Sequence, residues 1–205
     1  MILFEDFKSH MDVRLRWFSP PKAYRIESNT LIIETEKGSD FWQKTHYGFE
    51  ADNGHFLHCE LRGNFRLTTK VRPKPLHRYD QVGVMVRFST DTWIKASVEY
   101  IPAAPNKLGA VVTNHGYSDW STQEMQDDTA ELYFRISRIE NDFYVDYSED
   151  GEVWKQLRMA YLFADADKPI LAGVYACSPQ EEGYEAHVSF IQIEELSGDR
   201  TKVYG

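Results

Sequence analysis

Residues 81–100 read QVGVMVRFSTDTWIKASVEY, two runs in which apolar and polar side chains alternate on either side of a short polar break. A period of two places successive side chains on opposite faces of a β-strand. The valines of the first run and the aliphatic residues of the second therefore share one buried face. The stretch predicts an antiparallel hairpin whose other, polar face carries Gln81, Arg87, Lys95 and Glu99.

The break between the two runs also predicts how they pair. If Phe88 lies opposite Ile94, then Gly83 lies opposite Glu99, and Arg87 faces Lys95 across the polar side. A glycine opposite a carboxylate leaves room for a ligand group or for another backbone. The predicted pairing therefore makes Glu99 a candidate functional residue.

The same alternation recurs along most of the chain, between turn signals such as Asn53-Gly54 and Asp150-Gly151. One short helical turn is predicted at Leu162–Asp167. If the strands share a sheet, its polar face also carries His58, Glu60, Tyr133 and Arg135. About a dozen strands in two antiparallel sheets are predicted: Ala23–Ser28, Thr30–Thr35, His55–Arg62, Phe65–Arg72, Gln81–Ser89, Trp93–Tyr100, Leu108–Thr113, Glu131–Ile139, Asp142–Ser148, Trp154–Tyr161, Ile170–Ser178 and His187–Glu195.

Length and composition exclude several classes of protein. A chain of 205 residues with 42% hydrophobic residues fits one folded domain spanning residues 1–205. The net charge of −9 and the scattered basic residues argue against nucleic acid as a partner. No apolar run is long enough to span a membrane, and the first twelve residues lack the apolar core of a signal peptide. We therefore expect a soluble, cytoplasmic protein with Cys59 and Cys177 reduced and buried, a disulfide between them being the minority alternative.

Several motifs follow one another in an order that resembles a known family. Asp40-Phe41-Trp42, Tyr47-Gly48-Phe49 and Asp52-Asn53-Gly54-His55-Phe56 look like its opening motif, and residues 79–99 look like its central hairpin. Later matches include Ser118-Asp119-Trp120-Ser121 and Cys177-Ser178-Pro179. The family is the regulation-of-enolase type, and the resemblance implies a concanavalin A-like jelly-roll β-sandwich of two antiparallel sheets. It also implies a regulatory role, with a metabolic enzyme as a candidate partner.

The leading functional hypothesis is a binding module for a carbohydrate or another polyhydroxylated metabolite. Aromatic faces stack on sugar rings while nearby polar groups bind the hydroxyls. Trp42 and Trp120 are predicted to stack, although plugging one end of the sandwich is an equally simple role for such rings. Gln81 and His46 would bind hydroxyls, and Lys95 or Arg135 would attract an anionic group. The predicted lining is Trp42, His46, Tyr79, Gln81, Lys95, Glu99, Trp120 and Arg135.

A second hypothesis is a glycan hydrolase or lyase in which Glu99 is the catalytic acid or base. Such enzymes pair two carboxyl groups, and the second could be Asp119, Glu60 or Asp80. A structural ion pair of Glu99 with Lys95 or Arg87 is the competing interpretation. No cofactor is predicted. His46, His55 and His58 lie close in sequence, but their spacing matches no metal-binding template, so no metal site is predicted.

Overall fold

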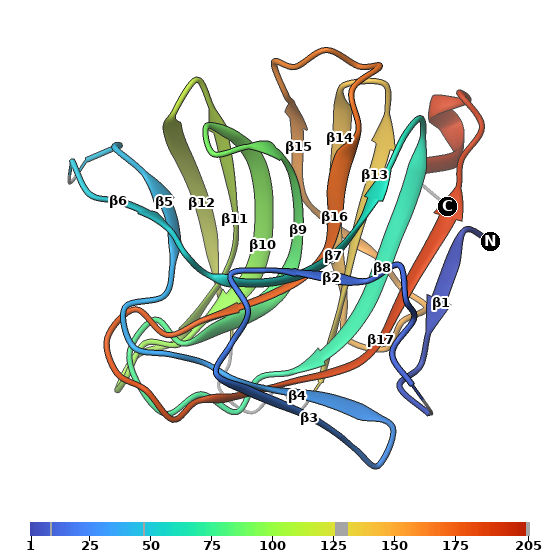
Figure 1. Ribbon diagram of the computed structural model, residues 1–205. Coiled ribbons are helices and arrows are strands. Elements are labelled where there is room, and N and C mark those ends of the chain that lie inside the picture. The colour runs from blue at the N-terminus through green and yellow to red at the C-terminus, as the bar shows by residue number, and fades with distance from the viewer. Residues whose placement is uncertain (9, 47, 126–130, 204–205) are drawn as a thin grey trace.

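The computed structural model describes residues 1–8, 10–46, 48–125 and 131–203; Tyr47 of the opening motif lies outside the described residues. Seventeen strands within this part of the chain form two large antiparallel sheets and one separate hairpin (Figure 1). The order of the back sheet is β15 (Lys155–Tyr161), β14 (Asp142–Ser148), β13 (Leu132–Ile139), β8 (Phe65–Arg72), β17 (Glu185–Glu195), β4 (Thr30–Glu34) and β3 (Ala23–Glu27), with β1 (Leu3–Glu5) on β17. The order of the front sheet is β12 (Tyr117–Met125), β11 (Asn106–Asn114), β10 (Thr92–Glu99), β9 (Gln81–Ser89), β16 (Ile170–Cys177), β7 (His55–Leu61) and β2 (Arg16–Phe18).

The inner faces of the two sheets enclose the main hydrophobic core. Val84 and Ala96 of the front sheet and Leu67 and Phe134 of the back sheet are members of this core, and all four are almost fully buried. Each belongs to an alternating run, so its neighbours in sequence point away from the core. Burial of these apolar faces is the dominant favourable contribution to the stability of the sandwich.

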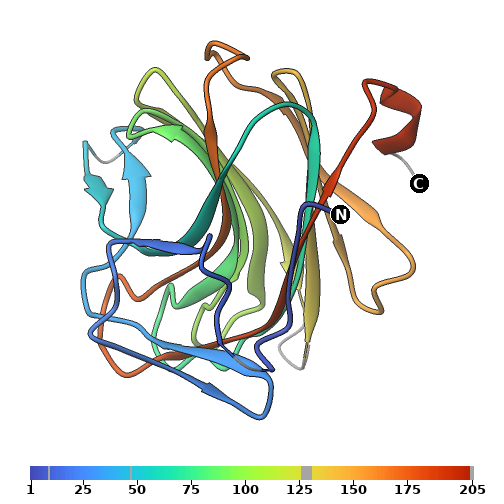
Figure 2. The ribbon, with the colours of Figure 1, turned by 45° about the vertical axis from the view of Figure 1, so that its right-hand side comes forward.

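The outer face of the front sheet is covered by the hairpin of β5 (Phe41–Gln43) and β6 (Glu50–Asp52), which stands outside the sandwich (Figures 1 and 2). Phe41 of this hairpin packs against Trp93 and Tyr175 at ring-centroid distances of 6.3 and 6.1 Å. These rings belong to a second, smaller hydrophobic cluster on the outer face. The face predicted to be polar is therefore partly apolar where the hairpin covers it.

The β9–β10 hairpin is confirmed, but its register differs from the prediction. A turn at residues 90–91 joins the strands, and a pairing irregularity follows at Thr92. This irregularity shifts the pairing, so Ser97 lies opposite Gly83 and Glu99 lies opposite Gln81. The predicted pairing of Gly83 with Glu99 is therefore wrong.

Gly83 also does not provide ligand space. A Cβ atom at this position would lie 1.9 Å from the carbonyl oxygen of Ala96, so the glycine permits close approach of two backbones. The predicted pairing of Arg87 with Lys95 is wrong as well, because Lys95 lies opposite Met85.

The sequence does not predict five of the strands. Four of them, β1, β2, β5 and β6, have three residues each, which is too short for an alternating pattern to stand out. The fifth, β12, is an edge strand with mostly exposed side chains. Leu162–Asp167 was predicted as a helical turn and is irregular; the helix found in the described residues is the 3₁₀-helix Arg200–Val203.

Cys59 and Cys177 are both buried and free. Cys59 belongs to the main core, whereas Cys177 belongs to the outer cluster. The front sheet therefore separates the two thiols. Within the described residues, no helix has the length and apolar character required to cross a membrane.

Candidate functional site

The β5–β6 hairpin carries one wall of a cavity on the front sheet and is fastened to the sheet by a short polar network. The side chain of Asn53 accepts a hydrogen bond from the Asp40 backbone N–H (3.1 Å) and donates one to the Gly38 carbonyl (3.1 Å). The Asp40 carbonyl accepts from the backbone N–H groups of Asn53 and Gly54. Both ends of the hairpin are thereby held together, and the Asp40 carboxylate is fixed in position.

The hairpin is also held by an ion pair with the sheet. Arg87 of β9 donates two hydrogen bonds to the carboxylate of Asp52, at 2.5 and 2.8 Å. The guanidinium also lies over the ring of Phe18, 4.6 Å from its centroid. A two-pronged contact of this kind fixes direction as well as distance. Asn53-Gly54, predicted as a hairpin turn, is instead the link between the β5–β6 hairpin and β7.

Between the hairpin and the sheet lies a cavity of about 550 Å³, which we call the central cavity. Its volume falls within the range of about 300–1,000 Å³ that is usual for small-molecule sites. It is lined by Asp40, Trp42, Phe49, Tyr79, Lys95, Glu99, Ile101, Lys107, Val111, Trp120, Pro179 and Gln180.

Buried polar groups form the floor of the central cavity. The Lys95 ammonium donates to Asp40 Oδ1 (3.1 Å) and to Gln81 Oε1 (3.0 Å). Gln81 Nε2 donates to Glu99 Oε1 (3.1 Å), and the Tyr175 hydroxyl donates to Gln81 Oε1 (2.9 Å). A chain of hydrogen bonds thus connects the two carboxyl groups through a lysine and an amide. Such a network holds each member in one orientation.

Gln81 does not contact the cavity directly. Its amide nitrogen donates to Glu99 and to the Tyr79 carbonyl, and its amide oxygen accepts from Lys95 and Tyr175. These contacts use both donor hydrogens and both acceptor lone pairs of the amide. The predicted role of Gln81 is to bind ligand hydroxyls; in the structure its amide is hydrogen-bonded to Lys95 and Glu99.

The charges on this floor are unequal, since one lysine lies close to two carboxyl groups. The pKa of Glu99 is raised to about 7: burial raises it most and the negative charge of Asp40 adds to this, while Lys95 and the Gln81 hydrogen bond lower it. Burial would lower the pKa of Lys95, but the negative charges around it, chiefly that of Asp40, raise it overall. Near neutral pH, Lys95 is therefore a cation and Glu99 is divided between its acid and its carboxylate.

Two tryptophans separate the central cavity from a second cavity of about 830 Å³, which we call the edge cavity. Trp42 of β5 and Trp120 of β12 line both cavities and contact each other edge to face, with ring centroids 6.5 Å apart. The Trp42 indole donates to the Thr45 carbonyl (3.1 Å). The edge cavity is lined by Trp42, Thr45, His46, Val112, Asn114, Tyr117, Ser118, Asp119, Trp120, Arg158, Met159, Ala160, Tyr161 and Phe163.

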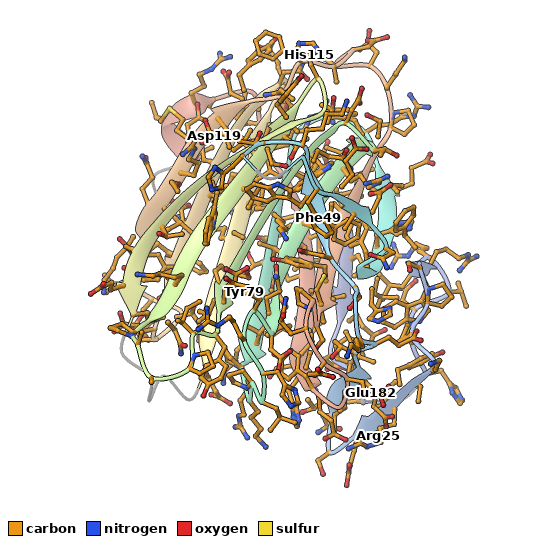
Figure 3. All side chains as sticks on the ribbon, turned by 90° about the vertical axis from the view of Figure 1, so that its left-hand side faces the viewer. Arg25, Phe49, Tyr79, His115, Asp119 and Glu182 are labelled. Atoms are coloured by element: carbon orange, nitrogen blue, oxygen red, sulfur yellow. The ribbon has the colours of Figure 1, made fainter. Side chains whose placement is uncertain are left out.

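The structure brings most of the predicted site residues together. Trp42, Tyr79, Lys95, Glu99 and Trp120 line the central cavity. Figure 3 shows the front sheet face-on, with Phe49 over the middle of the face and Tyr79 below it.

His46 and Arg135 lie elsewhere. His46 lines the edge cavity only. Arg135 is in β13 of the back sheet, so its predicted placement on one polar face with Lys95 is wrong, and the same holds for Tyr133. The guanidinium of Arg135 binds Asp146 and lies under the ring of Trp154. Alternation shows which side chains share a face of a strand, but it does not show which sheet the strand joins.

The carboxylate beside Glu99 is Asp40, which the sequence analysis did not consider for this role. Asp119 forms an ion pair with Arg158 in the edge cavity. Asp80 is buried and accepts hydrogen bonds from the Ser178 hydroxyl and from backbone N–H groups, and Glu60 lies in β7. Asp40 directly precedes Phe41-Trp42 in the opening motif. This position is the sequence feature that could have identified Asp40 as a site residue. Lys107, which also lines the central cavity, was not predicted as a site residue. It follows a loop with two prolines, and the predicted strand begins only at Leu108.

His55 and His58 have different surroundings in the structure. His55 Nδ1 contacts the Ser19 carbonyl (2.9 Å), and its Nε2 accepts from the backbone N–H of Glu36 (3.1 Å). Burial lowers the pKa of His58 to about 4, and this ring lies against Phe56. Among the described side chains, no three His, Cys, Asp or Glu residues gather into a possible metal site.

Comparison with known proteins extends over most of the chain. A family described as "Protein of unknown function (DUF1349)" matches residues 17–196. A relative named "Regulation of enolase protein 1", from Saccharomyces cerevisiae, is 34% identical over 173 residues, which are 84% of this chain and 85% of the relative. The family resemblance stated from the sequence motifs is therefore confirmed.

Solved structures share the fold. The crystal structure of a functionally unknown protein from Saccharomyces cerevisiae has a TM-score of 0.83 and 30% identity, covering 90% of this chain and 98% of that one. A xylan β-1,4-xylosidase from Bacillus halodurans has a TM-score of 0.75 at 12% identity, over 94% of this chain and 39% of that one. The CBM2 module of the Lactobacillus casei phage J-1 evolved Dit has a TM-score of 0.66 at 8% identity, over 97% and 96%. The predicted all-β jelly-roll sandwich is confirmed, and the two distant structures indicate the fold alone.

Proposed function

The chain belongs to the DUF1349 family of proteins of unknown function, and we propose that it binds a carbohydrate or another polyhydroxylated metabolite in the central cavity. The observation that carries this proposal is the floor of Asp40, Lys95 and Glu99 in a cavity that Trp42 and Trp120 also line. Such a site offers fixed polar groups from below and aromatic faces from the side. A sugar presents the matching surfaces, since its hydroxyls lie at the rim of the ring and its C–H groups on the faces.

The polar groups suit hydroxyls, which both donate and accept. Asp40 and the ionised form of Glu99 accept hydrogen bonds, whereas Lys95 and Lys107 donate them. Lys95 is already close to two carboxyl groups, so its charge is compensated within the protein. A neutral ligand therefore suits the floor better than a phosphate or a carboxylate.

The test is a thermal-shift screen of neutral and acidic sugars, followed by calorimetric titration of the hits. A specific ligand raises the melting temperature by mass action. We expect Trp120→Ala to abolish this shift while leaving the unliganded protein folded, because Trp120 is 43% exposed. The matched control is Trp154→Ala, which removes the same kind of side chain from a position just before β15, over Arg135 of the back sheet. Failure of every sugar to stabilise the wild type, or an equal loss in both variants, would contradict the proposal.

A second candidate function is a glycan hydrolase or lyase in which Glu99 is the acid or base. The pKa of Glu99 near 7 and the neighbouring Asp40 favour it, because a catalytic acid works best when its pKa is close to the working pH. The experiment compares turnover of chromogenic glycosides by the wild type and by Glu99→Gln. Release of chromophore that the variant lacks supports catalysis. Binding without turnover in the wild type leaves the protein a binding module.

A third proposed role is a regulatory contact with a metabolic enzyme, which the name of the yeast relative supports. We propose that this contact takes place in the cytoplasm. Titration of the protein into purified enolase, with and without a sugar hit, tests this role. A complex whose stability changes with the sugar would join the two roles. Unchanged sedimentation of enolase at every ratio would remove the partner and leave the binding site unaffected.

A further inference from the structure

The edge cavity lies beside the central cavity, between the free edges of the two sheets. It takes residues from β11 and β12 of the front sheet and from β15 of the back sheet. In Figure 3, Asp119 and His115 lie above Phe49 and Tyr79 on the same side of the molecule, so the two cavities follow one another along it. At about 830 Å³, the edge cavity has room for a ligand at least as large as one in the central cavity.

Large aromatic side chains are unusually exposed around this cavity. Tyr117, Trp120, Tyr161 and Phe163 line it, and each has two-fifths or more of its surface exposed. Isolated exposed apolar residues need no explanation, but a group of them around one cavity indicates a binding surface. These rings come from β12 of the front sheet, from β15 of the back sheet and from the loop after β15. Their gathering is therefore a property of the fold and could not be read from one stretch of sequence.

The aromatic rings are held in place before any ligand arrives. The side chain of Asn114 donates to the Tyr161 carbonyl and accepts from the Phe163 N–H, both at 2.9 Å, which ties the loop after β15 to the end of β11. Tyr161 and Phe163 contact each other with ring centroids 5.0 Å apart, and His115 packs against Phe163 at 5.3 Å. A surface ordered in advance binds without the entropic cost of ordering it.

The polar groups of the edge cavity are matched in charge. Arg158 donates to the carboxylate of Asp119 at 2.9 Å, so this ion pair spans the two sheets and is internally compensated. Such a lining offers hydrogen-bond donors and acceptors with little net charge. Aromatic rings beside polar side chains are the same combination that the central cavity presents, and the two cavities share Trp42 and Trp120 as their common wall.

From these observations we propose that the edge cavity binds further sugar units of an oligosaccharide whose first unit lies in the central cavity. The ligand class is thus a neutral glycan chain, and the Trp42–Trp120 pair lies where the chain passes from one cavity to the other. This inference rests on the proposed function and extends it, because a binding site for a single metabolite would not need the second cavity.

A peptide is the competing occupant, since an extended chain can add to a free sheet edge. Among the described strands, β12 pairs with β11 alone and β15 with β14 alone. The ion pair of Asp119 with Arg158 crosses between these two strands, however, and so lies where an added strand would pair with both. Continuity with the polar floor of the central cavity also favours a glycan.

The experiment is a glycan array that carries mono-, di- and longer oligosaccharides of many neutral linkages, with calorimetric titration of the hits. Two variants are compared, Tyr161→Ala in the edge cavity and Tyr24→Ala on β3. Both tyrosines lie in strands and are 48% exposed, so the two substitutions remove the same side chain at the same exposure. We expect Tyr161→Ala to lower the affinity for longer chains by about two- to tenfold, as for one lost stacking contact, and to leave mono- and disaccharides unchanged.

Each outcome bears on one of the two proposals. Rising affinity with chain length that Tyr161→Ala removes and Tyr24→Ala does not would support the inference. Binding of a monosaccharide with no gain from longer chains, or with equal effects of both variants, would overturn it and leave the proposed function standing. Binding of no sugar at all would overturn both, and a peptide that competes at Tyr161 would identify the other occupant.

Discussion

Each sheet carries a buried ion pair on a strand that also contributes to the main core, and the two pairs differ in what surrounds them. In the back sheet, Arg135 donates to Asp146 at 3.0 and 2.9 Å, and the ring of Trp154 lies 4.3 Å from the guanidinium. In the front sheet, Lys95 contacts Asp40 at 3.1 Å, but Glu99 lies nearby and the group borders a cavity.

The surroundings of a buried ion pair distinguish a structural role from a role in a binding site. Burial raises the pKa of Asp146 as well, but the Arg135–Asp146 pair has Arg66 nearby, lies under an aromatic ring and lines neither cavity, which is sufficient for a structural role. The Lys95 group has one carboxyl more than it has cations, and burial, with a smaller contribution from the charge of Asp40, raises the pKa of Glu99 to about 7. A perturbed pKa at a cavity marks a candidate functional site.

The largest expected effect comes from removing each cation. Lys95→Met and Arg135→Met should each destabilise the fold by about 3–5 kcal/mol, because each leaves a buried carboxylate without its partner. Urea denaturation measures both. Only Lys95→Met should also raise the pKa of Glu99, since Lys95 lowers that pKa in the wild type.

Titration of the carboxyl groups by NMR measures the pKa of Glu99 in both variants. Arg135→Met is the matched control, because it costs similar stability at a distance from the central cavity. An equal change in the pKa of Glu99 in both variants would contradict the separation of the two regions.

A smaller effect, of opposite sign, is expected from Glu99→Gln. The pKa of Glu99 is about 7 in the folded protein and near 4.5 in the unfolded chain, so the folded state retains a proton that the unfolded state has already lost. The contribution of Glu99 to wild-type stability therefore falls as the pH rises from 4.5 to about 7 and does not recover above it. The variant lacks this loss and should be more stable at about pH 8 by about 1–3 kcal/mol, and equal to the wild type near pH 4.5.

Thermal unfolding across this pH range checks the prediction for Glu99→Gln. Parallel stability curves for the two proteins would show that Glu99 titrates normally. The Lys95 group would then no longer be distinguished from the Arg135 pair by a titrating carboxyl group at a cavity.

The smallest effect on stability is expected when the hydrogen bonds that hold the chain at Asp40 are removed. Asn53→Ala removes two exposed hydrogen bonds and should cost about 1 kcal/mol. It should also lower the affinity for any sugar hit, because the position of Asp40 depends on it. Asn64→Ala is the matched control: its side chain accepts from the Glu140 N–H at 2.8 Å on the other side of the molecule. Loss of affinity in both variants would refute a local role for Asn53.

The sequence predicts which face of a strand is buried better than it predicts which residues of another strand lie opposite. Alternation identified the buried valines of β9, and three strands have the predicted bounds, because side-chain period follows directly from strand geometry. The register of β9 with β10 was wrong because it depends on a pairing irregularity at Thr92 that leaves no pattern in the sequence.

The candidate site was found in part for the same reason. Lys95, Glu99 and Trp42 could be proposed from their residue types and motifs. The role of Asp40 depends on the docking of the hairpin, and the separation of Arg135 from Lys95 depends on strand order. Neither is encoded locally, since both result from contacts between segments far apart in the chain.

The β5–β6 hairpin has a further consequence for the motions of the protein. It packs outside the main core through a small cluster, the Asp52–Arg87 pair and the bonds around Asp40. Segments held by few contacts open locally at lower free energy than the core. We therefore expect the hairpin to open at lower free energy than the two sheets, which would separate Asp40 and Trp42 from Lys95. Ligand entry and release would then follow the opening rate of one hairpin, and hydrogen exchange of its amides would report that rate.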